Sequence, residues 1–178
     1  MDVRRGVYAS DDQVTPVVRL FMPRGVQPMD ETVAVAGRDF IGVGVGALVF
    51  DDAGRVFMAQ RGRRARNEAG SWEFPGGSVT FGERLQDAVC REFFEEYGIR
   101  IEVTGFLGMF DHILPRESQH WVSGTYLGHH LSGSPFIREP DKCDAIGWFD
   151  LNGLPEPLSE ITRLNLEAYE RMGHDGHR

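Results

Sequence analysis

The stretch GGSVTFGERLQDAVCREFFEEYGI, residues 76–99, decides how this chain is expected to fold. It opens with two glycines in a turn-prone segment and continues as a helix that carries Glu92, Glu95 and Glu96 within one turn. At about 100° per residue, these carboxylates share one edge of the helix, and apolar side chains fill the neighbouring arc. Gly98 follows the last periodic residue, where a left-handed cap is expected. Such a helix packs one side on a sheet and turns its acidic edge towards a cleft.

Three carboxylates at this spacing predict a cation. Like charges three or four residues apart on a helix repel by about 0.2–0.5 kcal/mol per pair. Hard divalent ions such as Mg²⁺ take oxygen ligands and are completed by substrate phosphates. The pattern therefore indicates metal-assisted chemistry on a phosphate ester or anhydride. For Glu95 and Glu96 alone, a solvated helix face is the alternative, but the spacing of the whole segment favours the metal site.

The same segment resembles the signature of the Nudix hydrolases. All defined positions of that signature are present, at Gly77, Glu83, Arg91, Glu92, Phe93, Glu95, Glu96, Gly98 and Ile99. The resemblance covers residues 40–172 and implies an α/β fold, the Nudix-type α/β/α sandwich with a mixed central sheet. It also implies Mg²⁺ or Mn²⁺ as the cofactor.

The resemblance further assigns roles to individual residues. The metal ligands it implies are Glu92, Glu95 and Glu96, with the Gly76 carbonyl as a further ligand and Glu83 as an auxiliary one. Arg91 would hold the glutamates by charge-assisted hydrogen bonds. The general base stays open: the candidates are Glu92 and, outside the signature, Glu139, Asp141 and Asp144. For the last three, a solvated turn beside Pro140 is the alternative.

Upstream of the signature, RGRRARNEAGSWEFPGG (61–77) resembles the MutT-type members of the family. Arg61 directly follows an expected strand, and by this resemblance it would bind substrate phosphate. The other three arginines of the segment fit a solvated loop. Trp72 and Phe74 would line a base pocket, with plain core packing as the alternative. Further on, EPDKC (139–143) and the segment 147–158 resemble the MutT-like branch, which acts on nucleoside triphosphates.

The function implied by this resemblance is metal-dependent hydrolysis of a nucleoside triphosphate or a related nucleoside diphosphate derivative, giving a monophosphate and pyrophosphate. Alternatives are a nucleoside diphosphate sugar hydrolase, a dinucleoside polyphosphate hydrolase and a nucleotide-sensing Nudix domain without turnover. An RNA-cap hydrolase is disfavoured, because it would need a basic stripe for the RNA backbone and the arginines at 61–66 are confined to one short segment.

Composition agrees with one globular enzyme domain of 178 residues, 41% hydrophobic and 26% charged. The net charge of −8 disfavours broad binding to nucleic acids or anionic membranes and leaves a small nucleotide as the expected substrate. Cys90 and Cys143 show no metal-ligand spacing. Cys90 is expected to be a core residue of the helix, so we expect no disulfide and a cytoplasmic location. Neither a membrane-spanning apolar run nor a secretory signal is expected.

The hydrophobic pattern predicts the remaining elements. Strands are expected at 40–50, 56–60, 101–110, 120–130 and 145–150, a loop at 111–119, and an amphipathic helix at 157–172. The inward residues expected on that helix segment are Leu158, Ile161, Leu164, Leu166 and Tyr169. We expect a Nudix domain at 39–172, preceded at 1–38 by an extension that is an arm, a hairpin or the contact of a homodimer. The tail 173–178 is expected to be frayed.

Overall fold

Two central strands, β1 (Gly42–Phe50) and β2 (Val56–Arg61), divide their side chains between two hydrophobic clusters. Odd-numbered residues such as Val45 and Phe57 lie in one cluster, and even-numbered residues such as Leu48 lie in the other. The reason is that successive side chains of a strand point to opposite faces of the sheet. Both faces are therefore buried, which explains why the expected strand at 40–50 is almost continuously apolar.

The computed structural model describes residues 34–175, and these contain one mixed sheet of seven strands. Five strands run in the order β3-β2-β1-β6-β5, while β4 pairs with β1 and β7 with β2. Strands β1 and β6 are parallel, and the other pairs are antiparallel. The remaining strands are β3 (Trp72–Glu73), β4 (Gly76–Ser78), β5 (Arg100–Leu114), β6 (Gln119–Ser132) and β7 (Cys143–Phe149).

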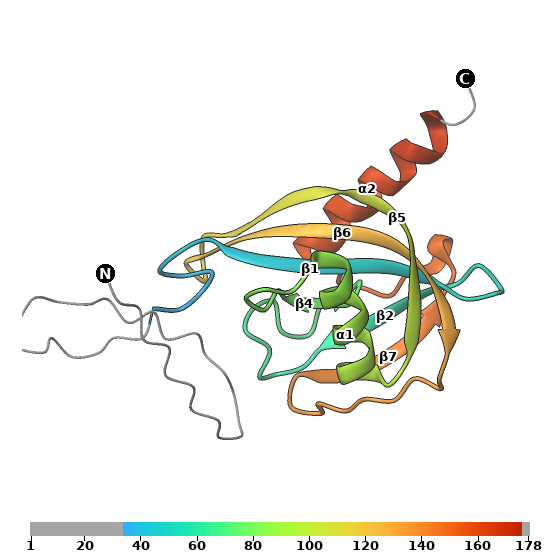
Figure 1. Ribbon diagram of the computed structural model, residues 1–178, viewed down its shortest axis with the longest axis horizontal. Coiled ribbons are helices and arrows are strands. Elements are labelled where there is room, and N and C mark those ends of the chain that lie inside the picture. The colour runs from blue at the N-terminus through green and yellow to red at the C-terminus, as the bar shows by residue number, and fades with distance from the viewer. Residues whose placement is uncertain (1–33, 176–178) are drawn as a thin grey trace, which may run out of the picture.

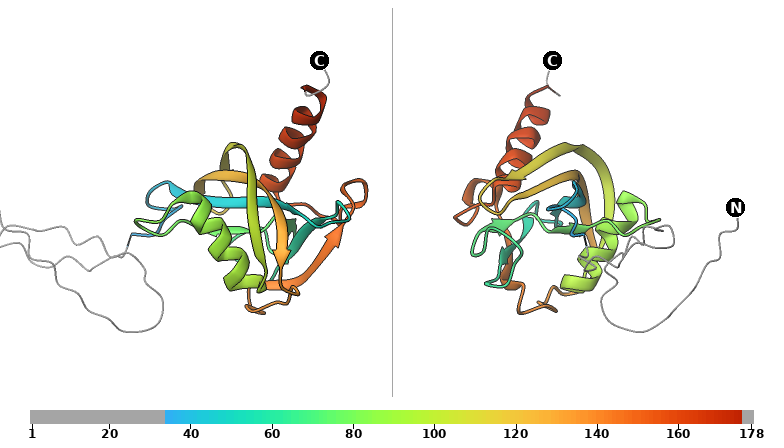
Figure 2. Two further views of the ribbon diagram at one scale, coloured as in Figure 1. Left: turned by 45° about the vertical axis from the view of Figure 1, so that its right-hand side comes forward. Right: turned by 90° about the vertical axis from the view of Figure 1, so that its left-hand side faces the viewer.

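Helices α1 (Leu85–Tyr97) and α2 (Glu160–Asp175) lie on opposite sides of the curved sheet, as Figures 1 and 2 show. Helix α1 packs its apolar side on the first hydrophobic cluster and ends at Gly98, whose φ of 71° is left-handed as expected. A short 3₁₀ helix, η1 (Leu151–Gly153), precedes α2. The expected α/β/α sandwich is confirmed.

Two expected boundaries were wrong. The loop expected at 111–119 is largely strand, because β5 continues to pair with β6 up to Leu114 and only residues 115–118 form the turn. The second helix begins at Glu160 and continues to Asp175, so residues 173–175 are helical rather than frayed. Residues 176–178 lie outside the described residues, and so do residues 1–33 of the expected N-terminal extension.

Helix α2 buries two polar side chains that were not expected, while Leu158, just before the helix, lies in the second cluster as expected. Leu166 and Tyr169 pack against the second cluster, but the most buried positions of the helix are the polar residues Thr162 and Asn165. No helix within residues 34–175 has the length and apolar character that a bilayer span requires.

Candidate active site

A cleft of about 410 Å³ opens where α1, the glycine-rich strand β4 and the loop between β2 and β3 meet. Its lining residues come from segments that are far apart in the chain. The charged and polar ones include Arg61, Arg64, Arg66, Asn67, Glu73, Glu92, Glu96, His112, Ser123, Thr125, Glu139, Lys142 and Asn165. Because these groups surround one space, the cleft is the candidate active site.

One side of the cleft, the acidic wall, consists of Glu92, Glu96 and Glu139. Burial, together with the charges of Glu92 and Glu139, raises the pKa of Glu96 to about 7. Burial also raises the pKa of Glu92, with repulsion from Glu139 adding to the effect and Arg91 opposing it. A divalent cation would remove this repulsion.

Arg91 binds the glutamates of the signature from the side away from the cleft. Its Nε and Nη2 atoms donate to the Glu83 carboxylate at 2.8 and 3.0 Å. Its Nη1 atom donates to Glu92 Oε1 at 2.8 Å and to Glu95 Oε2 at 2.9 Å. The guanidinium group also donates to the Ser78 carbonyl at 3.1 Å, which ties the helix to the glycine-rich segment. Arg91 therefore fixes the direction of Glu92 without lining the cleft.

Two glycines bring the backbone of β4 against the helix. A side chain at Gly77 would collide with the carboxylate of Glu92, and one at Gly76 would collide with the carbonyl oxygen of Val45. Gly76 lines the cleft beside Glu92. Only glycine allows this close approach, and it leaves backbone carbonyls next to the acidic wall.

The loop wall, formed by Arg61, Asn67 and His112, is held by polar contacts within the protein. Arg61 Nη1 pairs with Glu73 Oε2 at 2.5 Å, while its Nε and Nη2 donate to the carbonyl and side-chain oxygens of Asn67 at 2.9 and 2.8 Å. Burial raises the pKa of Glu73, and the Arg61 guanidinium opposes the shift. Because a guanidinium has five N–H donors, two remain for a ligand.

His112 and Asn67 join the loop wall to the rest of the fold. His112 Nε2 lies 3.1 Å from Glu68 Oε2, and the other oxygen of Glu68 accepts the backbone N–H of Glu160, the first residue of α2, at 2.8 Å. Asn67 donates to Gln119 Oε1 at 2.8 Å. The loop wall is thus fixed by residues of β5, β6 and α2.

The inner end of the cleft lies against α2 and contains Phe74, Thr125, Ile161 and Asn165. Thr125 Oγ1 donates to Asn165 Oδ1 at 3.0 Å, which turns the amide of Asn165 and leaves its NH₂ group without a partner among the described hydrogen bonds. Sequence reasoning missed Asn165. The available signal was a polar residue at an inward position of an otherwise apolar helix stripe.

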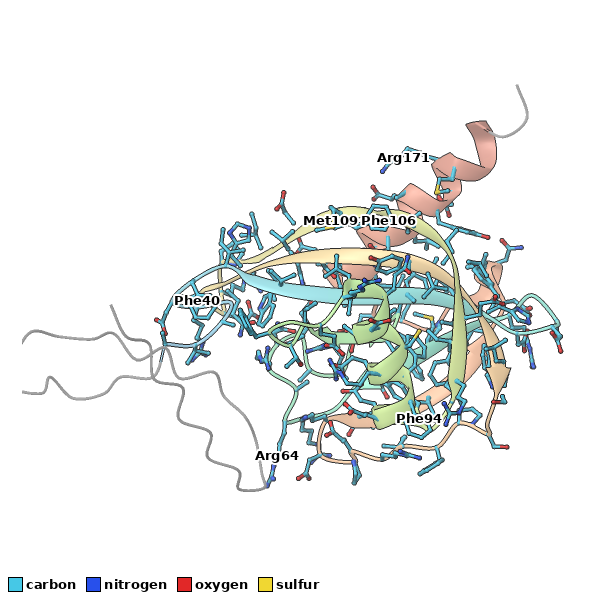
Figure 3. All side chains as sticks on the ribbon, viewed as in Figure 1. Phe40, Arg64, Phe94, Phe106, Met109 and Arg171 are labelled. Carbon is cyan, nitrogen blue, oxygen red and sulfur yellow. The ribbon has the colours of Figure 1, made fainter. Side chains whose placement is uncertain are left out.

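Two cations lie at the rim near the acidic wall. Lys142 Nζ is 2.7 Å from Glu139 Oε2. Arg64, which projects from the molecule in Figure 3, pairs with Asp141 at 3.1 Å, and both side chains are more than two-thirds exposed, at 76% and 73%. Arg66 also lines the cleft, and its guanidinium lies 4.9 Å from the ring centre of Trp121.

The cleft brings together about half of the residues that the sequence singled out. Those that line it are Arg61, Phe74, Gly76, Glu92, Glu96 and Glu139. Those that are absent from its lining are Trp72, Glu83, Arg91, Glu95, Asp141 and Asp144. Trp72 instead packs in the second cluster, with its ring centre 5.2 Å from that of Phe149. Trp72 therefore occupies a position in the hydrophobic core, which was the alternative to a base-pocket role.

The donor chemistry of the acidic wall fits a divalent cation. Within residues 34–175, no group of three or more His, Cys, Asp or Glu side chains is assembled closely enough to hold an ion by itself. Mg²⁺, however, is commonly held by one or two carboxylates together with waters and substrate phosphates. Glu92 and Glu96, which both face the cleft, supply such a pair.

Comparison with known proteins gives consistent matches. Residues 41–170 match the family described as the NUDIX domain. An RNA pyrophosphohydrolase from Dinoroseobacter shibae is 33% identical over 145 residues, which cover 72% of this chain and 86% of that protein. A MutT-like protein from Streptomyces ambofaciens is 29% identical over 140 residues, covering 75% of this chain and 84% of that protein. The crystal structure of a MutT NUDIX hydrolase from Burkholderia pseudomallei matches with a TM-score of 0.66 and 46% identity, covering 71% of this chain and 96% of that one.

Proposed function

Since this chain belongs to the Nudix hydrolase family, we propose that it hydrolyses the pyrophosphate linkage of a nucleoside triphosphate or a related nucleoside diphosphate derivative. From a triphosphate it releases a nucleoside monophosphate and pyrophosphate. The observation that carries this proposal is the arrangement of one cleft, in which an acidic wall and a rim with cations lie beside a neutral inner end. We assign the activity to residues 39–172.

The Nudix family generally uses divalent metal ions, and we infer that Mg²⁺ or Mn²⁺ is the ion here. Glu92, Glu96 and the Gly76 carbonyl would hold it, while Glu83 and Glu95 act through Arg91. When bound, the ion would neutralise the charge of the phosphoryl oxygens and lower the pKa of a bound water.

Glu139 is our choice for the general base. It lines the cleft, whereas Asp144 is exposed and Asp141 is exposed and paired with Arg64. Glu92, the other candidate, is bound by Arg91 and is assigned to the metal ion, whereas Glu139 pairs with Lys142 at the rim and is not among the proposed metal ligands. Glu139 would take a proton from the attacking water as its oxygen bonds to phosphorus, and the anhydride P–O bond would break with its electrons passing to the leaving phosphate group.

The nucleotide would place its base at the inner end and its phosphates towards the rim. Asn165 offers an amide NH₂ group to the base edge, and Phe74 and Ile161 offer apolar contact. The phosphates would meet the two remaining N–H groups of Arg61 and the ammonium of Lys142. This orientation puts the anhydride beside the acidic wall.

A second substrate form is the 5′-triphosphate end of RNA. The relative from Dinoroseobacter shibae is named an RNA pyrophosphohydrolase, and the reaction would remove pyrophosphate from the same kind of triphosphate. Exposed Arg64 and Arg66 at the rim are the groups that a following nucleotide would meet.

A substrate panel tests the proposal. The full-length protein is incubated with nucleoside triphosphates, nucleotide sugars, a dinucleoside polyphosphate and a triphosphorylated RNA oligonucleotide, with Mg²⁺, with Mn²⁺ or with EDTA, and products are identified by mass spectrometry. We expect metal-dependent release of pyrophosphate from triphosphates. Cleavage of only nucleotide sugars or dinucleotides would replace the proposal with that alternative. Tight nucleotide binding without hydrolysis under any condition would favour a sensor.

A further inference from the structure

The connection between β6 and β7 lies across the C-terminal end of α1, as Figure 1 shows. We call its residues 133–142 the strap. The backbone N–H of Phe136 donates to the Tyr97 carbonyl at 3.1 Å, and that of Arg138 donates to the Glu96 carbonyl at 3.0 Å. These are among the last carbonyls of a helix, which have no partner within the helix itself. The strap is thus bonded to the same turn of α1 that carries Glu96.

The side chains of the strap add a stack of rings and guanidinium groups. The Arg138 guanidinium lies 5.0 Å from the ring centre of Phe94 on α1 and 4.9 Å from that of Phe136 on the strap. Arg100, at the start of β5, lies over the same Phe94 ring at 4.8 Å. Phe94, labelled in Figure 3, is 39% exposed, and Phe136 is 52% exposed. Arg138 therefore clamps the strap to the helix through two aromatic faces.

Close packing of the backbone reinforces this clamp. A side chain at Gly98 would strike the ring of Phe136, at 2.5 Å from its Cε1 atom. A side chain at Gly133 would lie 2.6 Å from the Gly98 carbonyl oxygen. The glycine that forms the left-handed cap of α1 therefore also allows the strap to pack closely against the end of the helix.

The far end of the strap is fixed as well. The N–H of Gly62 donates to the Lys142 carbonyl at 2.7 Å, and the N–H groups of Lys142 and Cys143 both donate to the Glu139 carbonyl, at 2.9 and 3.1 Å. Glu139 lies between this anchor and the clamp formed by Arg138, the residue directly before it. Its carboxylate is close enough to Glu92 and Glu96 to raise the pKa of both.

We propose that Arg138 is a positioning residue that sets Glu139 against the acidic wall by clamping the strap to Phe94. This inference rests on the proposed function, because it takes Glu139 as the general base. The Arg138 side chain stacks on rings that are absent from the cleft lining, and it makes no ion pair with a described acidic residue. Its contribution should therefore appear in kcat rather than in substrate binding.

The test compares Arg138→Ala with Arg100→Ala, a matched control. Both substitutions remove one guanidinium from the face of Phe94, but only Arg138 belongs to the strap. We expect Arg138→Ala to lower kcat about 10- to 100-fold with KM nearly unchanged, because a small misplacement of a reacting group can reduce the rate about 100-fold. Arg100→Ala should keep kcat within about twofold. Arg138→Lys should recover part of the loss, since an ammonium also binds an aromatic face.

A double-mutant cycle with Glu139→Gln separates positioning from general stabilisation. If Arg138 acts through Glu139, then Arg138→Ala should cause no further loss of kcat in the Glu139→Gln background. Losses that multiply would overturn the inference, as would equal losses in the Arg138 and Arg100 variants. An active Glu139→Gln enzyme would also overturn it while leaving the proposed function intact, since that function is judged on the wild-type protein and fails if that protein releases no pyrophosphate from nucleoside triphosphates.

Discussion

The acidic wall and the loop wall border one cleft, yet their polar groups are balanced in different ways. On the acidic wall, burial and the charge of Glu139 raise the pKa of both Glu92 and Glu96, and Arg91 offsets the charge of Glu92. On the loop wall, Arg61 is paired with Glu73 and His112 with Glu68. Glu92 and Glu139 pair with Arg91 and Lys142, so Glu96 is the carboxylate of the acidic wall that has no cationic partner within residues 34–175. The difference teaches that the acidic wall keeps an unbalanced, partly buried carboxylate, whereas the loop wall pairs its charged groups with one another.

Among the changes that test this difference between the two walls, removal of an acidic-wall carboxylate should lower kcat the most. We expect Glu96→Gln to lower kcat by about 10²- to 10³-fold, a loss typical when a preorganised electrostatic group is removed from a catalytic site. Glu95→Gln should lose only about tenfold, because the Glu95 side chain is 57% exposed and reaches the site through Arg91. Steady-state kinetics with Mg²⁺ and a nucleoside triphosphate measure both. Equal losses would make Glu95 a direct member of the acidic wall.

The second-largest loss of kcat should come from displacing the Glu92 carboxylate without changing the charge of the site. In Gly77→Ala the new methyl group would occupy the position of the Glu92 carboxylate. We expect kcat to fall by about 100-fold, as small misplacements in active sites do. Gly153→Ala is the control, since a side chain there would meet nothing within 4 Å. If Gly77→Ala keeps wild-type kcat, the close packing of β4 on α1 plays no part in catalysis.

The inner end should show a smaller and different effect. Asn165→Ala removes the NH₂ group proposed to face the base, and it also ends the hydrogen bond from Thr125. We expect KM for a nucleoside triphosphate to rise by about five- to tenfold, since one hydrogen bond contributes about 1 kcal/mol. The kcat value should change little. A fall in kcat at constant KM would place Asn165 near the chemistry instead of the base.

The smallest expected effect concerns stability. The pKa of Glu96 rises from its usual 4.5 to about 7 in the fold, so the folded carboxyl binds its proton more tightly than the unfolded one. The free energy of unfolding should therefore fall as pH rises from about 4.5 through 7. The Glu96→Gln variant has no carboxyl group to titrate at this position, so its free energy of unfolding should not fall for this reason as the pH rises. In EDTA, the Tm of this variant should exceed that of the wild type by several degrees more at pH 8 than at pH 4.5.

Differential scanning fluorimetry at the two pH values measures this difference. Added Mg²⁺ should raise the Tm of the wild type more than that of the variant, because a ligand stabilises only the state that binds it. A pH-independent gap between the two proteins would mean that Glu96 is not held among repelling carboxylates.

Local patterns were enough to predict the helix of the acidic wall and most of the sheet. The helix of residues 85–97 was expected from the spacing of its apolar and acidic residues, and its cap at Gly98 from the glycine after them. The strand boundaries were less certain because pairing decides them: β5 extends to Leu114 only since β6 continues opposite it.

Burial was harder to predict than secondary structure. Trp72 is of a residue type that often stacks on a base, yet it lies in the core beside Phe149. Asn165 is of a type that is usually exposed, yet it is buried at the inner end of the cleft. The helical spacing marks position 165 as inward, but nothing in the neighbouring residues says whether such a position faces the core or the cleft. Each outcome depends on which distant element packs against the position.

The sequence by itself determined the carboxylate edge of α1 and the family to which the chain belongs, because both depend on spacings within a single continuous segment. Only the tertiary structure decided which carboxylates face the cleft, and that Glu139, His112 and Asn165 join them there. These residues are separated from the signature by whole strands, and their approach follows from sheet pairing and packing rather than from any local pattern.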